Sequence, residues 1–305
     1  MSDLKGIIPL LKPPGFTSHD CVGKLRRILR IKRIGHTGTL DPSVTGVLPL
    51  CIGQATRVVE YLQELPKEYV GTLVLGKSTN TEDADGEILE DRVVENEISE
   101  DTVHQVLSSF IGTIEQIPPM FSAVKVNGVR LHQLARQGKE IERKPREVQI
   151  YEIEPLSMAL NQDYPEITIR VKCSKGTYIR TLCVDIGKKL GFPAHMKGLQ
   201  RTASGPFKLK DCYTFERIEE AVQQDRIAEL LKPVDLALEK FPTWVVNEDQ
   251  VQDILNGKKM RLDLSAPEGQ LLRVYSHDNQ FLALYRVMYE GKKEWGKPEK
   301  VFRDT

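Results

Sequence analysis

The sequence predicts an α+β protein with a mainly antiparallel sheet, followed by a small β-rich module. Helix-like and strand-like segments follow one another irregularly, without the regular strand, helix, strand order that is typical of a parallel sheet. The tail changes character at about Phe241 and becomes strand-rich. We therefore expect two domains, residues 1–240 and 241–305, an ordinary division for a chain of 305 residues.

The first predicted helix follows a turn at residues 12–15, where two prolines and a glycine interrupt the chain. Thr17 or Ser18 can cap this helix. Three apolar residues then recur at helical spacing: Val22, Leu25 and Leu29. The glycines and prolines of residues 35–53 exclude a further regular helix and predict a shaped loop that leads into short apolar strands.

Two strands and two helices are predicted in the middle of the chain. Tyr69–Leu75 is rich in Val, Leu and Thr, and Ile167–Cys173 alternates apolar and polar residues as a half-buried strand does. Residues 100–111 are amphipathic. A second helix should follow the turn at residues 174–177 and end at Gly191.

Residues 115–147 and the tail are the most distinctive remaining segments. Residues 115–147 combine prolines, an Asn-Gly pair and many cations with few core-forming residues, so we predict a protruding hairpin and helix. In the tail, residues 271–288 are strand-like, with a hairpin turn predicted at residues 277–279.

The charges are balanced in number but sorted along the chain. There are 43 basic and 43 acidic residues, yet residues 21–40 and 186–210 contain no acid, and acids concentrate in residues 82–101. One basic run alone would be interpreted as a solvated helix face. Two runs, each beside a glycine-rich loop, favour a basic surface that contacts RNA.

Several classes of protein are excluded. The N-terminal residues form neither a signal peptide nor a membrane span, so we expect a cytoplasmic protein without a membrane partner. The five cysteines are scattered and contain no C-x-x-C pair, so we expect reduced, buried thiols and no metal site. The six histidines show no H-x-x-x-H spacing, and no G-x-S-x-G motif occurs.

Two motif matches are misleading. Residues 71–78 match the phosphate-binding pattern G-x-x-x-x-G-K-S, but that loop must open a helix, whereas Thr72–Leu75 is itself predicted as strand. Residues 82–87 are acidic, but they lack the ligand spacing of an EF-hand. We expect a strand at the first match and a solvated turn at the second.

Asp41 lies between a glycine-rich turn and Pro42, directly after the cationic helix. From composition alone it would be a turn-capping residue. The surrounding motif, GHTGTLDPSVTGVLP at residues 35–49, resembles the signature of the TruB-type tRNA pseudouridine-55 synthases. The resemblance covers about residues 6–240 and includes further motifs: KPPGFTSHD at 12–20, Lys67-Glu68-Tyr69, NTEDADGE at 80–87 and CSKGTYIR at 173–180.

The resemblance implies a pseudouridine synthase fold with a C-terminal PUA-like domain that binds RNA. It further implies that uridine 55 in the T loop of tRNA is flipped out and isomerised to pseudouridine. It assigns a role to each of seven residues: Asp41 is catalytic, Tyr69 stacks on the base, Arg180 partners the aspartate, His36 wedges into the T loop, Leu199 packs near the uracil, and Lys12 and Pro13 line the pocket.

The chemistry is compatible with these residue types. The reaction breaks the bond between ribose C1′ and uracil N1 and rejoins the base through C5, so it needs no redox group and we expect no cofactor. A carboxylate suits this task, and a guanidinium would oppose the rise in its pKa that burial causes. The residues do not decide whether Asp41 attacks the base or the sugar, or removes a ribose proton.

The sequence leaves alternatives open for the partner residues. Arg180 stands in the first turn of a helix, where a cation opposes the helix dipole, so it either serves another purpose or extends to solvent. Tyr69 either recovers stacking energy of about 1–3 kcal/mol from a flipped base or is a core aromatic. Gln200 departs from the two consecutive arginines more common in the family, which should cost one phosphate contact.

The expected partner is the T arm of tRNA, clamped in part by residues 115–147. No protein partner is indicated, and we expect a monomer. Two other functions compete with this one: a non-catalytic RNA-binding protein in which Asp41 only shapes a loop, and a nucleotide-dependent enzyme that uses residues 71–78.

Overall fold

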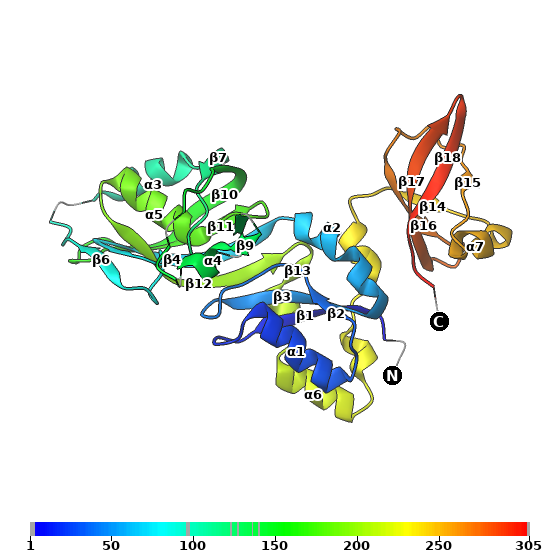
Figure 1. Cartoon of the computed structure of the whole chain (residues 1–305), viewed down its shortest axis with the longest axis horizontal. Coiled ribbons are helices and arrows are strands. Elements are labelled where there is room, and N and C mark those ends of the chain that lie inside the picture. Colours follow the sequence, from blue (N-terminus) through cyan, green and yellow to red (C-terminus); the bar gives the residue numbers. More distant parts are fainter. Residues whose placement is uncertain are drawn as a thin grey trace.

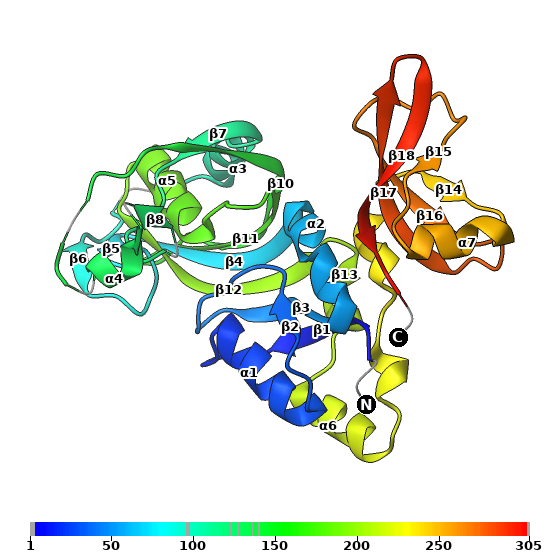
Figure 2. The same ribbon diagram turned by 45° about the vertical axis from the view of Figure 1, so that its right-hand side comes forward.

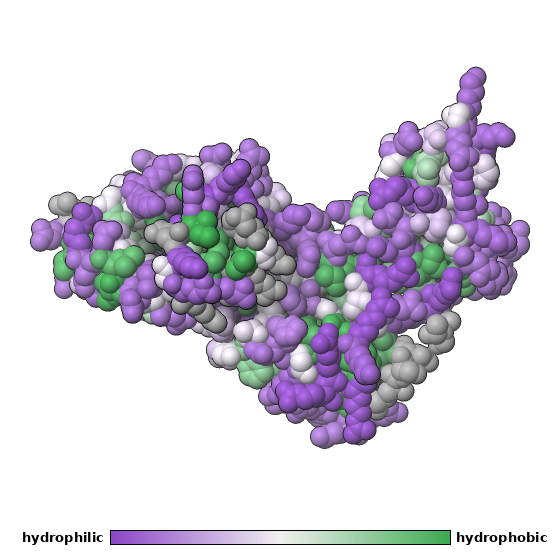
Figure 3. All heavy atoms as spheres, in the orientation of Figure 1, coloured by the Kyte–Doolittle hydropathy of each residue, from purple (hydrophilic) through white to green (hydrophobic). Residues whose placement is uncertain are grey.

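The computed structural model describes residues 4–95, 98–122, 124–126, 128–135, 137–139 and 141–303. Within these residues a nine-stranded sheet forms the centre of the molecule, and a five-stranded sheet forms the C-terminal module (Figure 1). Figure 3 shows a broad hollow between the lobe that carries helices α3 and α5 and this module.

The central sheet is mainly antiparallel, as predicted. Its strands run in the order β1-β3-β12-β4-β11-β10-β7, with β2 beside β3 and β13 beside β12. Only the pairing of β3 with β12 is parallel among its described strands. The strand bounds are β1 (Gly6–Lys12), β2 (Ile34–His36), β3 (Thr45–Ile52), β4 (Lys67–Leu75), β7 (Gly112–Gln116), β10 (Arg146–Ala159), β11 (Glu166–Cys173), β12 (Ala194–Ser204) and β13 (Phe207–Lys208).

Helices cover this sheet in two groups. Helices α3 and α5 pack on β4, β10, β11 and β12 around one apolar cluster, and α1 and α6 pack on β1 and β3 around another. The two groups form separate lobes in Figures 1 and 2, joined by β12. The helix bounds are α1 (Ser18–Leu29), α2 (Val59–Glu64), α3 (Glu100–Ser108), α4 (Leu131–Ala135), α5 (Ile179–Leu190), α6 (Phe215–Gln223) and α7 (Glu248–Leu255), with short 3-10 turns η1 (Gly53–Val58), η2 (Leu209–Asp211), η3 (Ile227–Leu230) and η4 (Val234–Leu238).

Local sequence signals explain where the two site-flanking helices begin and end. Thr17 caps α1: its hydroxyl accepts from the backbone N–H of Asp20 at 3.0 Å, while the Asp20 carboxylate accepts from the backbone of Thr17. Helix α5 ends at Gly191 in the left-handed conformation with φ 87°. Both helices were predicted from these residues, and both are confirmed.

The C-terminal module packs against the lobe that carries α1 and α6, which is called the first lobe from here on. It contains β14 (Thr243–Val245), β15 (Met260–Arg261), β16 (Leu271–Tyr275), β17 (Phe281–Glu290), β18 (Lys293–Val301) and helix α7. The predicted hairpin is confirmed between β16 and β17. Leu271, Leu284 and Phe302 share an apolar cluster with Val47 and Val58. The domain division at residue 240 therefore stays a prediction.

Residues 115–147 contain the predicted hairpin and helix. The hairpin is β8 (Lys125–Val126) with β9 (Val129–Arg130), and α4 follows directly. In Figure 2 they lie at the outer end of the lobe that carries α3 and α5, beside a second small hairpin of β5 (Lys77–Thr79) and β6 (Ile88–Asp91). Asn127 of the predicted Asn-Gly turn lies outside the described residues, and the clamping role stays a prediction.

Three further expectations concern thiols, membranes and metals. All five cysteines are free, and four of them are buried. None of the described helices has the length and apolar character needed to cross a bilayer. In the part of the chain that the structure describes, no three His, Cys, Asp or Glu side chains come together as metal ligands.

Candidate active site

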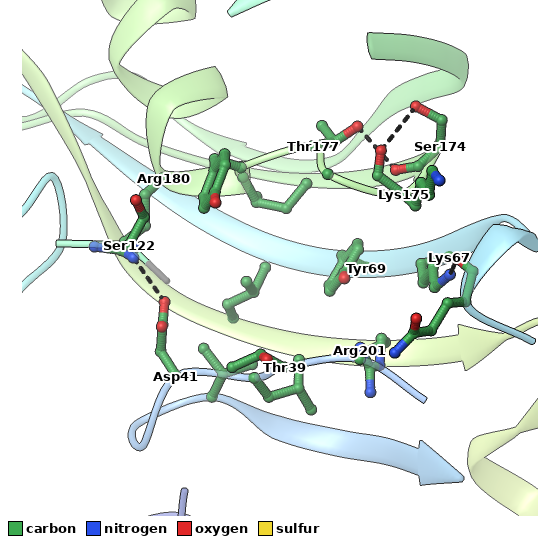
Figure 4. Close-up of a pocket in the computed structure, with 18 of the residues that line it drawn as sticks. Thr39, Asp41, Lys67, Tyr69, Ser122, Ser174, Lys175, Thr177, Arg180 and Arg201 are labelled. Carbon is green, nitrogen blue, oxygen red and sulfur yellow. Dashed lines mark hydrogen bonds and ion pairs between the residues drawn. The ribbon is translucent and has the colours of Figure 1, made fainter. Parts of the chain in front are cut away.

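A cavity of about 360 Å³ opens where the two lobes meet, between β4, β12 and the loop that follows β2. Figure 4 shows Asp41 and Arg180 at one end, Lys67 at the other, and Tyr69 between them. Three segments distant in sequence build its walls: residues 37–44 from the loop, Ser174–Arg180 from the turn before α5, and Leu199 with Arg201 from β12.

A buried lysine fixes the loop that carries Asp41. Lys12 is 0% exposed, and its ammonium donates to the backbone carbonyls of Pro13 at 3.0 Å, Pro42 at 3.1 Å and Val44 at 2.7 Å. Carbonyls on both sides of the turn are thus satisfied by one cation. The turn after Asp41 is held in one position, as a reacting carboxylate requires.

Arg180 is the immediate partner of Asp41. Its Nη2 lies 3.0 Å from Oδ2 of Asp41, and its side chain is only 5% exposed. The same guanidinium donates to the carbonyls of Thr81 and Phe121, both at 2.8 Å, and its Nη1 lies 3.6 Å from Oδ2 of Asp83. Arg180 is therefore fixed from four directions and does not extend to solvent, which decides between the two alternatives left open for it.

The acidic turn at residues 82–87 is exposed at Ala84, Asp85 and Glu87, as predicted, but the prediction was wrong for its first two residues, Glu82 and Asp83. Asp83 is buried and faces Arg180. The Glu82 carboxylate accepts from the hydroxyl of Thr181 at 2.6 Å. The turn is drawn onto α5 because a buried guanidinium needs carboxylates around it. An EF-hand remains excluded by the spacing.

Burial and the Asp83 carboxylate raise the pKa of Asp41, whereas Arg180 lowers it. Burial raises the pKa of Asp41 above its ordinary 3.8, and the guanidinium of Arg180 opposes that rise. The neighbouring Asp83 carboxylate raises the pKa further. The Asp41 side chain is 41% exposed, and it lines the cavity.

Tyr69 and Leu199 form the apolar part of the cavity. Tyr69 lies on β4 between Val171 of β11 and Arg201 of β12. Leu199 lies over Gly71, where an added Cβ would come 2.8 Å from its Cδ1. A glycine at position 71 thus lets the leucine approach the strand closely. The two side chains offer a flat aromatic face and an aliphatic surface to a ligand.

Arg201 is a site residue that the sequence analysis missed. It is 1% exposed, its Nε donates to the carbonyl of Val47 at 2.6 Å, and its Nη2 finds no hydrogen-bond partner among the described residues. Burial raises the pKa of Tyr69, and the Arg201 guanidinium opposes this rise. The sequence departs from the family pattern at Gln200, so an effect was predicted for Gln200 and none for Arg201.

Lys67 is a second missed cation, at the other end of the cavity. Its ammonium donates to the carbonyls of Leu62, Gln63 and Leu65, the last at 2.7 Å. Burial lowers the pKa of Lys67 to about 8. Lys67 belongs to the Lys67-Glu68-Tyr69 motif that the chain shares with the family, and the sequence contains no other signal of its position.

Three of the predicted residues lie outside the cavity lining. Lys12 and Pro13 are not among the residues that line the cavity, because the Lys12 ammonium contacts the carbonyls of the turn after Asp41, and their role at the pocket stays a prediction. His36 ends β2, one residue before the lining residue Thr37, and its Nδ1 lies 3.0 Å from the carbonyl of Gly38. Burial lowers the pKa of His36, which favours a neutral ring.

Two remaining sequence features have clear positions. Gln200 donates to the hydroxyl of Thr45 at 3.3 Å, and its predicted effect on phosphate binding stays a prediction. Residues 71–75 are strand and β5 follows, with no helix after Gly76. The nucleotide-binding interpretation of residues 71–78 is therefore excluded by the fold.

The arrangement joins a carboxylate–guanidinium pair, a tyrosine and a leucine in one cavity. Such a cavity suits a flat, uncharged ring attached to a sugar, with the carboxylate beside the bond between them.

Family models and curated relatives match most of this chain. Residues 26–179 match the TruB family pseudouridylate synthase (N terminal domain), and residues 180–239 match the tRNA pseudouridylate synthase B C-terminal domain. The tRNA pseudouridine synthase B of Bacillus cereus is 50% identical over 286 residues, 92% of each chain. That of Halalkalibacterium halodurans is 46% identical over 301 residues, 98% of each chain.

Solved structures share the fold. A chain of a Cbf5-Nop10-Gar1 complex superimposes with a TM-score of 0.75 at 31% identity, covering 98% of this chain and 85% of that one. A chain of an H/ACA RNP bound to a substrate RNA containing 2′-deoxyuridine gives a TM-score of 0.73 at 28% identity, with the same coverage.

Proposed function

The chain belongs to the TruB family of pseudouridylate synthases, isomerases that convert uridine in tRNA to pseudouridine, and we propose that its substrate is uridine 55 of the T loop. The observation that supports a catalytic role most directly is the Asp41–Arg180 ion pair, 3.0 Å long, at one end of the cavity. We also propose a cytoplasmic location, because tRNA is the substrate.

In this proposal Asp41 starts the reaction. Its ionised carboxylate acts beside the glycosidic bond, the C1′–N1 bond breaks, and the uracil turns within the cavity. The C1′–C5 bond then forms, the C5 proton leaves, and N1 takes up a proton, so no electron or group is gained overall. Arg180 keeps the carboxylate ionised and directs its Oδ2, because the guanidinium is itself held by Thr81, Phe121 and Asp83.

The remaining residues hold the base. Tyr69 offers a face on which the flipped uracil stacks, and Leu199 confines the ring from the side of β12. His36, at the end of β2 beside the cavity, fills the space that the extruded nucleotide leaves in the T loop. Its depressed pKa favours a neutral imidazole, which stacks without an added charge.

Mapping the modified position tests this proposal. An unmodified tRNA transcript treated with the purified protein, with excess chelator and without nucleotide, should acquire one pseudouridine, at position 55. We expect position 55 to remain unmodified when the transcript carries cytidine there. Modification at another position would overturn the assigned substrate, and tRNA binding without any modification would favour the non-catalytic RNA-binding alternative.

A further inference from the structure

Three arginines gather where the C-terminal module meets the first lobe. Arg33 follows α1, Arg57 lies in η1, and Arg303 follows β18. Together they line a groove of about 440 Å³. In Figures 1 and 2 the end of β18 descends to the blue region that contains β2 and η1, so the views agree on this meeting point.

Among the described residues, no carboxylate forms an ion pair with the arginines of this cluster. Glu299, which also lines the groove, is bonded to Arg286 at 3.1 Å. Burial, followed by the charges of Arg33 and Arg303, lowers the pKa of Arg57. The chain has equal numbers of acidic and basic residues, yet it keeps three cations together although their mutual repulsion costs free energy.

Each guanidinium of the cluster donates one hydrogen bond within the part of the chain that the structure describes. Arg33 Nε donates to Thr56 Oγ1 at 2.7 Å, Arg57 Nη1 to the carbonyl of Val301 at 2.5 Å, and Arg303 Nε to the carbonyl of Leu255 at 2.8 Å. A guanidinium carries five N–H donors, so each keeps donors for a further acceptor. The forks are positioned before any ligand arrives, which lowers the entropic cost of binding.

The cluster lies close to the catalytic cavity. Arg33 directly precedes β2 and His36 ends it, so the three-residue extended stretch between them spans about 10 Å. Thr37, the next residue, lines the cavity. A nucleic acid whose loop enters the cavity beside Thr37 would therefore bring phosphates close to Arg33 and to the groove that Arg33 shares with Arg57 and Arg303.

We propose that Arg33, Arg57 and Arg303 form a phosphate-binding site for the stem of the substrate RNA, outside the loop that enters the cavity. Planar guanidinium forks match phosphate oxygens in pairs, and a polyanion relieves the mutual repulsion of three cations gathered in one groove. This inference rests on the proposed function for the identity of the RNA. It adds a site that joins the first lobe to the C-terminal module.

The test replaces all three arginines with glutamine and measures RNA affinity against salt concentration. Each lost phosphate contact should lower the slope of log Kd against log salt by about 0.7–0.9, or about 2–3 for the triple variant. We expect the Kd for a stem-loop RNA to rise at least about tenfold, with kcat at saturating RNA unchanged. Arg33→Gln with Arg303→Gln, which keeps the Arg57–Val301 bond, should give an intermediate loss.

The matched control is Arg217→Gln with Arg226→Gln. Both arginines are exposed and already paired, with Glu220 and Glu229 at 2.7 Å, so their loss should leave affinity and salt slope unchanged. Wild-type affinity and slope in the triple variant would overturn the inference, as would an equal loss in the control. The inference would also be overturned if inorganic phosphate, added at a saturating concentration and at matched ionic strength, left RNA binding unchanged. Absence of catalysis by the wild-type protein would overturn the proposed function and leave this binding test intact.

Discussion

At the scale of single residues, the central question is what charge Asp41 carries. Arg180 lies on one side of the carboxylate and Asp83 lies beyond the guanidinium, so one neighbour favours ionisation and the other opposes it. Asp41 and Asp83 share the guanidinium of Arg180. Replacing Arg180 or Asp83 with a neutral residue should therefore change the pKa of Asp41, and the two replacements should change it in opposite directions.

We predict opposite pH shifts for Arg180→Gln and Asp83→Asn. Activity requires the ionised Asp41, so it should rise with pH through the pKa of that group, which is above 3.8. Losing Arg180 removes the main influence that lowers this pKa, so the acid limb should move to higher pH and the rate should fall. Losing the Asp83 charge should move it to lower pH. Single-turnover rates against pH measure both shifts, and a shift in the same direction would contradict the assignment.

Replacing Arg201 should lower activity much more than stability. Its guanidinium is buried beside Tyr69, with Nη2 lacking a partner among the described residues, so the folded protein gains little from its charge. We predict that Arg201→Met lowers Tm only slightly, because the Val47 carbonyl loses one donor, but lowers kcat about a hundredfold, because Tyr69 loses the neighbour that holds it. Arg201→Lys should recover part of the rate. A parallel fall of Tm and kcat in the methionine variant would indicate a purely structural role.

At the scale of elements, the conformation of the Asp41 loop depends on Lys12, a cation at the end of β1. Lys12, at the end of β1, satisfies carbonyls on both sides of the turn after Asp41. Removing it leaves buried acceptors unsatisfied. The loop geometry is therefore a property of β1, β3 and the turn together.

We predict that Lys12→Met lowers the free energy of unfolding by about 2–4 kcal/mol, because hydrogen bonds to a charged group are lost and carbonyls stay buried. Turnover should fall with it, since Asp41 is no longer held. Denaturant unfolding and single-turnover assays measure the two effects. Thr17→Ala, which weakens only the cap of α1, should cost about 1 kcal/mol and keep the rate. Equal rates in both variants would show that Lys12 does not position the loop.

The same elements show how far the sequence can predict the structure. Helices α1 and α5 were predictable because their caps and apolar spacing are local signals. The burial of Asp83 was not predictable, because its partner Arg180 lies in a helix far along the chain. The position of Lys12 behind the loop depends likewise on a contact between separate strands. Local patterns predicted the elements, whereas charges buried by distant contacts required the fold.

At the scale of the whole molecule, the catalytic cavity lies where two separately packed lobes meet along β12, and the C-terminal module shares a core with the first lobe. One lobe supplies Asp41, and the other supplies Arg180 and Tyr69. The reaction therefore depends on both lobes being joined correctly. The central claim is that this joined site performs glycosidic chemistry through Asp41.

Release of tritium from C5-labelled uridine in a T-arm RNA tests that claim most directly. The wild-type protein should release tritium under single-turnover conditions. Asp41→Asn should bind the RNA with about the same Kd and release none, and Asp41→Ala provides a variant that cannot revert by deamidation. Release at a substantial rate by both variants would contradict the account, because the cavity would then act without its carboxylate.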